Sequence, residues 1–166
     1  MITVDPGSAD FYFVPEDGAA YQVAYRGVAA TENVELCVGA YALTDAPLVA
    51  QIIANAKRPG LAQFVLVDKS QTLDPIQLAA VKSIIAAGVQ TLVGTTQYDE
   101  ILHSKYLLGK ATSTVVTGSY NFSKSAATQD NIATVFRSEE LWTAARAHFQ
   151  AEWDQVKAND SQAWLA

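Results

Sequence analysis

Short apolar runs alternate along this chain with longer amphipathic stretches, and turn or capping signals separate them. Runs rich in apolar and β-branched residues predict buried strands, and helical periodicity predicts helices. Strands are expected at 11–14, 34–40, 64–67, 89–93, 102–108, 114–117 and 131–136, and helices at 19–30, 48–57, 74–87, 121–127 and 138–157. This alternation predicts an α/β fold, a three-layer αβα sandwich around a mixed, largely parallel β-sheet.

Signals at the helix ends support these bounds. Asp45 with Pro47, and Asp74 with Pro75, each place a capping side chain before a proline in the first turn, where no N–H is needed. Gly88 is expected to end the helix that Asp74 opens, because glycine readily adopts the left-handed conformation. No internal repeat is present, and one domain over residues 1–166 is expected.

Composition is that of an ordinary folded protein. Half of the residues are apolar and 17% are charged, and no apolar run approaches the roughly 18 residues of a membrane helix. The first residues, Met1 to Pro6, lack the basic and apolar regions of a secretory signal. A cytoplasmic location is therefore expected, or an exported form if a signal has been removed. Cys37 has no disulfide partner and is expected to be buried in a strand.

The formal net charge of −6 argues against a long basic groove. Phosphate neutralisation supplies most of the affinity of nucleic-acid binders, which usually carry an excess of basic residues. Lys105, Lys110 and Lys124 nevertheless lie close together in the sequence. The net charge does not exclude a local positive pocket made by these three side chains, which would attract a phosphate.

The most informative residues are His103 and Lys105, which precede the turn Gly118-Ser119-Tyr120-Asn121. Side chains two apart on a strand point to the same face, so the imidazole and the ammonium are expected to lie together. The turn would bring a hydroxyl and an amide to the same small anion. The other histidine of the chain, His148, lies at helical spacing among apolar residues and is expected at the surface or in packing.

His-x-Lys followed by Gly-Ser-x-Asn resembles the signature of the phospholipase D superfamily, in particular its small single-motif bacterial nucleases. The blocks 41–45, 65–71 and 86–89 extend the resemblance, which covers the chain from Phe11 to Trp153. Lys110 stands where the family has an aspartate. That position points away from the face of His103 and Lys105, so only a supporting role, such as capping the hairpin turn, is expected for the missing carboxylate.

The resemblance implies a role for each motif residue. His103 would act as nucleophile or as general acid, and Lys105 and Asn121 would hold the phosphate oxygens. Ser119 would donate a hydrogen bond beside them, and Lys124 would add positive charge. No metal or other cofactor is implied.

A carboxylate that orients the imidazole is also implied, shortly after the asparagine. Asp130 is the first choice, and Asp68 and Asp99 are the alternatives. The family uses two histidines, and only His103 lies in a motif. A twofold homodimer that shares one site across its interface is therefore expected.

Alternative interpretations stay open. Tyr98, Tyr106 and Tyr120 flank the motif, where packing is the expected role and stacking on a base is the alternative. A nuclease with DNA or RNA as substrate is the first hypothesis. A phospholipid phosphodiesterase, a non-catalytic module that binds nucleic-acid phosphates, and one part of a larger assembly are the others. No stable membrane association is expected, because no basic amphipathic helix is present in the sequence.

Overall fold

A seven-stranded sheet, in the order β1-β7-β6-β5-β2-β3-β4, forms the centre of the computed structural model, which describes residues 8–96 and 98–159. The strands are β1 (Ala9–Val14), β2 (Glu35–Ala40), β3 (Ala62–Asp68), β4 (Gln90–Gly94), β5 (Lys105–Gly109), β6 (Thr114–Gly118) and β7 (Asn131–Arg137). The helices are α1 (Gly18–Thr31), α2 (Ala46–Asn55), α3 (Lys69–Thr72), α4 (Pro75–Ala86), the 3-10 helix η2 (Ser125–Thr128) and α5 (Glu139–Ala158).

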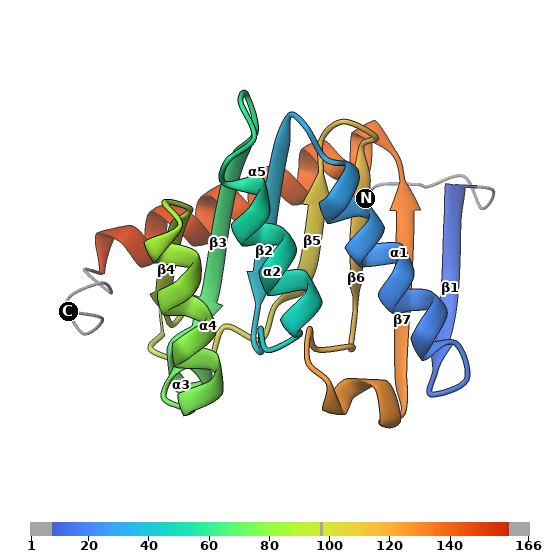
Figure 1. Cartoon of the computed structure of the whole chain (residues 1–166), viewed down its shortest axis with the longest axis horizontal. Helices are drawn as coiled ribbons and strands as arrows, with labels where there is room; N and C mark the ends of the chain where they lie inside the picture. Colours follow the sequence, from blue (N-terminus) through green and yellow to red (C-terminus); the bar gives the residue numbers. More distant parts are fainter. Residues whose placement is uncertain (1–7, 97, 160–166) are drawn as a thin grey trace.

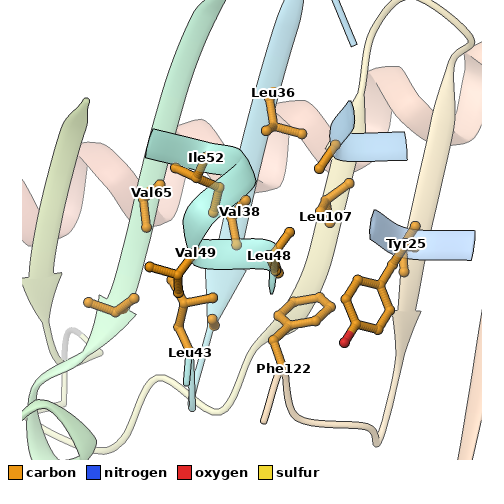
Figure 2. Packing of buried hydrophobic residues seen from close by; sticks show 14 of the residues in the cluster. Tyr25, Leu36, Val38, Leu43, Leu48, Val49, Ile52, Val65, Leu107 and Phe122 are labelled. Atoms are coloured by element: carbon orange, nitrogen blue, oxygen red, sulfur yellow. The ribbon is translucent and has the colours of Figure 1, made fainter. Parts of the chain in front are cut away.

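Helices cover both faces of the sheet, which confirms the three-layer αβα sandwich (Figure 1). α1, α2 and α4 lie over one face, where side chains such as Val38, Leu48 and Leu107 form an apolar core (Figure 2). α5 crosses the other face and buries Trp142 and Phe149 in a second core. Within the described residues, none of the helices is long and apolar enough to cross a bilayer.

The sheet is mixed, but the expectation that it is largely parallel is wrong. Of the described strands, β2, β3 and β4 pair in parallel, and the four remaining neighbouring pairs are antiparallel. Parallel neighbours need a crossover connection, which α2 supplies between β2 and β3 and α4 between β3 and β4. β5 and β6 are joined by a short hairpin turn, which makes them antiparallel.

Most predicted elements are present close to their predicted bounds. The side chains of Asp74 and Ser138 accept hydrogen bonds from backbone N–H groups at the starts of α4 and α5, as expected for caps. Gly88 follows α4 with a φ of +89°, and Cys37 is buried in β2. Differences also occur: the helix expected at 121–127 is only the 3-10 turn η2, and the single-turn helix α3 was not expected. The Asp45 side chain, expected to cap α2, makes no capping hydrogen bond and accepts instead from Tyr25 and Arg26.

One end of the sheet, the lower end in Figure 1, collects the connections that carry the motif residues. β2, β3 and β6 end there, and β5 and β7 begin there. The β5–β6 turn, which holds Lys110, lies at the opposite end. The topology therefore brings His103, Lys105 and the Gly118-Ser119 turn to one edge and separates Lys110 from them.

Candidate active site

His103 lies in the loop before β5 and not in the strand, which begins only at Lys105. The expectation of a strand from residue 102 is wrong at this point, because the Leu102 N–H donates to Oδ2 of Asp68 (2.8 Å) instead of to a neighbouring strand. The His103 side chain is exposed. Its ring packs edge-on against the ring of Tyr41, with the two centroids 4.8 Å apart.

Lys105 is buried at the start of β5, and its side chain contacts the same tyrosine ring as His103. Its ammonium donates to the His103 carbonyl oxygen (Nζ–O 2.7 Å) and lies 4.9 Å from the centre of the Tyr41 ring. Burial lowers the pKa of Lys105, and the negative charge of Asp68 opposes that shift. The result is a poorly hydrated positive charge, which suits the binding of an anion.

Asp68, the last residue of β3, is hydrogen-bonded to two segments next to the site, the start of α3 and the loop that carries His103. Its carboxylate is fully buried and accepts hydrogen bonds from the Ser70 hydroxyl and the Gln71 N–H at the start of α3. The same carboxylate holds the Leu102 N–H. Asp68 therefore fixes the backbone next to His103, although no hydrogen bond to either ring nitrogen of that histidine occurs among the described residues.

The turn after β6 is held by Ser119. Gly118 has a φ of +146°, and a Cβ added there would lie 2.3 Å from the carbonyl oxygen of Ile132, so only glycine fits. The Ser119 hydroxyl donates to Oδ1 of Asn131 (3.0 Å) and accepts from the Ile132 N–H (3.1 Å). Asp130 is exposed and has no hydrogen bond within the described part of the chain, so its role in orienting the imidazole stays a prediction.

Asn121 is fixed by the buried aromatic residues on either side of it. Tyr120 packs on Tyr21 of α1 (centroids 5.0 Å apart), and Phe122 packs on Tyr25 (5.2 Å; Figure 2). The Asn121 amide has one buried polar atom, Oδ1, without a hydrogen-bond partner in the described residues. Such an atom is costly unless something binds it, which makes this amide a candidate ligand-binding group.

Lys110 lies outside the site, so a pocket of all three lysines does not form. Its ammonium pairs with Glu139 (2.5 Å) and lies 4.2 Å from the centre of the Trp142 ring on α5. Lys105 faces the opposite side of the sheet, as the strand alternation predicts. The turn that the missing aspartate was expected to cap is held instead by the buried carboxylate of Glu32, which accepts from the Ala111 N–H (2.9 Å).

Five other residues singled out in the sequence are placed as follows. Lys124 is exposed beside η2 and makes no ion pair or hydrogen bond through its side chain within the described residues. His148 is exposed and lies 3.4 Å from Glu152, which confirms a surface position. Tyr106 and Tyr120 pack in the structure, and the Tyr106 hydroxyl donates to Glu152, whereas Tyr98 is exposed.

Tyr41 is the functional residue that sequence reasoning missed. Its ring contacts both His103 and Lys105, and its hydroxyl accepts from Nε2 of Gln71 (2.8 Å). Together with Asn121 it also lines a pocket, so Tyr41 is the residue that the pocket shares with the surroundings of His103 and Lys105. The signal was its place directly after the buried strand β2, at the edge where strand ends collect polar side chains.

Taken together, an exposed imidazole and a desolvated ammonium contact the ring of Tyr41, and the Asn121 amide lines a pocket together with the same tyrosine. That set can bind a small anion and supply a nucleophile or a proton to it. Across residues 8–96 and 98–159, no group of three His, Cys, Asp or Glu side chains is arranged to hold a metal ion.

The family profile described as "Cardiolipin synthase, PLD-like domain" matches residues 28–153. No curated protein sequence matches the chain. Among solved structures, the phospholipase D family member Nuc from Salmonella typhimurium is 24% identical, with a TM-score of 0.78 over 89% of this chain and 95% of its own. NucT from Helicobacter pylori is 14% identical, with a TM-score of 0.77 over 89% and 96%.

Phosphatidylserine synthase from Haemophilus influenzae is 13% identical, with a TM-score of 0.65 over 88% of this chain and 36% of its own longer chain. At these identities the solved structures establish the fold. The profile covers well over half of the sequence and includes His103, Lys105 and Asn121. The chain therefore belongs to the PLD-like domain family of the phospholipase D superfamily.

Proposed function

We propose that this protein is a metal-independent phosphodiesterase whose substrate is a nucleic acid. The observation that carries the proposal is the contact of the His103 imidazole and the Lys105 ammonium with the ring of Tyr41, which lines one pocket together with the partly unpaired amide of Asn121. Phosphoryl transfer needs a nucleophile, a proton for the leaving oxygen and positive charge at the non-bridging oxygens. In this proposal, His103 supplies the nucleophile and Lys105 supplies the positive charge.

In the proposed mechanism, a ring nitrogen of His103 attacks phosphorus and the bond to the leaving oxygen breaks. A second histidine gives its proton to that oxygen, which leaves as an alcohol, and a phosphohistidine remains. The second histidine then takes a proton from water, whose oxygen attacks phosphorus and releases His103. Lys105 and the Asn121 amide hold the non-bridging oxygens through both steps, and Ser119 keeps the turn in place.

The second histidine comes, in this proposal, from a second copy of the chain. His148 does not supply it, because it lies on α5 beside Glu152, on the face of the sheet away from Lys105. Exposed apolar side chains at the same end of the sheet, on the face that also carries α5, are available for a dimer: Phe13 pairs in register with Ile132, and Phe11 is exposed on the same face. Burying these side chains favours association of two copies.

A phospholipid substrate is the second candidate, favoured by the description of the matching family profile. The pocket beside Asn121 argues for a nucleic acid, because its walls are mainly hydroxyl, amide and carboxylate side chains. An acyl chain would need an apolar wall. Lipid and nucleic-acid substrates are therefore compared side by side in the test.

The test is cleavage of single- and double-stranded DNA, RNA and phospholipid vesicles in excess EDTA. We expect nucleic-acid cleavage by the wild type, and a loss of at least about 10³-fold in His103→Ala, because the nucleophile or acid is removed. His148→Ala is the matched control and should keep wild-type activity. A protein that cuts no nucleic acid in clean samples, or a His103→Ala variant as active as the wild type, would overturn the proposal.

A further inference from the structure

A polar pocket of about 240 Å³ opens beside the proposed phosphate site. Its walls come from the segments before α2 and α4 and from η2, and include Thr44, Asp74, Ser125 and Gln129. Tyr41 and Asn121 also line it. His103 and Lys105 do not line the pocket, but both contact Tyr41, which does, so the pocket is one side chain away from the proposed phosphate site.

The pocket walls suit an uncharged ligand that forms hydrogen bonds. No Lys or Arg is among the lining residues, and Asp74 is. The side chains of Thr44 and Gln129 have no hydrogen-bond partner among the described residues, and a buried atom of the Asn121 amide is also unpaired. Only one oxygen of Asp74, Oδ1, is used, in accepting the N–H groups of Ile76 and Gln77. A second phosphate would be repelled here, whereas hydroxyl and amino groups would find partners.

The size of the pocket limits what can enter. Pockets for whole drug-sized ligands measure about 300–1,000 Å³, so this one accommodates a smaller unit. One sugar with its base is a unit of that kind, and its hydroxyl, carbonyl and amino groups match the walls. The next phosphate of a strand must then lie outside, in solvent, which agrees with the acidic net charge of −6.

We propose that this pocket is a subsite for the nucleoside that stays attached to the scissile phosphate. The inference rests on the proposed phosphodiesterase activity and adds a specificity to it. Thr44, Ser125 and Gln129 are the residues that recognise the nucleoside. The exposed positions of Ser125 and Gln129 make them suitable for substitution without loss of the fold.

The test compares three esters with the same leaving group: methyl p-nitrophenyl phosphate, and thymidine p-nitrophenyl phosphate linked through the 3′ or the 5′ oxygen. We expect wild-type kcat/KM to favour one thymidine ester over the methyl ester by at least about tenfold. Ser125→Phe, which fills the pocket, should reduce that ratio to about one, and Gln129→Ala should reduce it in part. Ser83→Phe, on the exposed side of α4, is the matched control and should leave the ratio unchanged.

The outcomes separate the two proposals. Equal hydrolysis of all three esters by the wild type, or a preference that survives in Ser125→Phe, would overturn the subsite and leave the phosphodiesterase standing. Hydrolysis of none of them, together with no cleavage of nucleic acid, would overturn the proposed function and the subsite with it.

Discussion

Asp68 shows how a single buried carboxylate can set the electrostatics of this site without touching the substrate. It lies close enough to Lys105 to oppose the lowering of that residue's pKa by burial, and it holds the backbone of the histidine loop. Lys105 must be protonated to hold a phosphate oxygen. Under the proposed function, activity should therefore be lost as the pH rises through the lowered pKa of Lys105.

Replacing Asp68 with asparagine should therefore move the alkaline limb of the pH profile of kcat/KM to lower pH. The negative charge that opposes the lowered pKa is removed, so the pKa of Lys105 falls further. kcat should also fall by about 10- to 100-fold, since the histidine loop loses an acceptor and shifts. Asp154→Asn, an exposed carboxylate on α5, is the control. An unchanged alkaline limb in Asp68→Asn would show that Asp68 acts on the backbone alone.

Lys110 tests whether the departure from the family signature matters for catalysis. Lys110→Asp, which restores the family residue, should leave kcat/KM within about twofold of the wild type, because the side chain points to α5 and away from the site. Stability should fall: Lys110→Ala loses the contact with Trp142, worth about 0.5–1 kcal/mol. The stability of Lys110→Asp should fall further, because the new carboxylate faces the carboxylate of Glu139. Urea unfolding and ester hydrolysis measure the two effects, and a large gain in activity would show that the aspartate is catalytically needed.

At this scale the motif residues could be nominated from the sequence, and their surroundings could not. His103, Lys105 and Asn121 were candidates because their types and order resemble the family signature, and their roles stay predictions. Tyr41 was not identifiable, because its contact with His103 joins segments far apart in the sequence and depends on the order of β2 and β5 in the sheet. Tyr120 could be assigned to packing or to stacking until its burial against Tyr21 was visible.

Among the elements, the turn after β6 is the one whose backbone decides the site. Gly118 combines a positive φ with a neighbouring carbonyl oxygen 2.3 Å from any added Cβ. Ser119 and Asn121 follow directly, so a shift of this turn moves both. Glycine here is a requirement of the backbone and not only part of a recognisable motif.

Gly118→Ala should lower the free energy of unfolding by more than about 2 kcal/mol, since strain and a steric clash add together. Gly27→Ala is the matched control, in the middle of α1 with nothing within 4 Å of an added Cβ. It should raise stability by about 0.5–1 kcal/mol, because alanine favours the helix. Urea unfolding of both variants measures the difference. Equal changes in the free energy of unfolding for the two variants would contradict the positive φ and the close contact described for Gly118.

Helices and strands were predictable from periodicity and caps, and the pairing of the strands was not. A buried strand such as β2 has an apolar sequence whether its neighbours run parallel or antiparallel, so the pattern does not separate the two cases. The start of β5 was missed because the Leu102 N–H bonds the side chain of Asp68, a contact that no local pattern reveals. Long-range contacts therefore account for both corrections.

At the scale of the whole molecule, the proposed mechanism needs two histidines at one site, and one chain supplies one of them. Each described chain brings one imidazole, that of His103, to the edge where Lys105 and Asn121 meet. The exposed pair Phe13 and Ile132 lies at the same end of the sheet and is available for a second copy. A shared site requires a dimer whose twofold axis brings the two histidine loops opposite each other, so that one phosphate lies between them.

Mixed dimers distinguish a shared site from two independent sites. Wild type and His103→Ala are unfolded together in equal amounts and refolded, so that the subunits pair at random. If each site needs both histidines, only dimers of two wild-type chains are active. The activity should then be about one quarter of that of an equal total amount of protein that is all wild type. Independent sites would retain about one half. Wild type refolded with Ser83→Ala controls for refolding losses, and Phe13→Asp should give an inactive monomer if the apolar face is the interface.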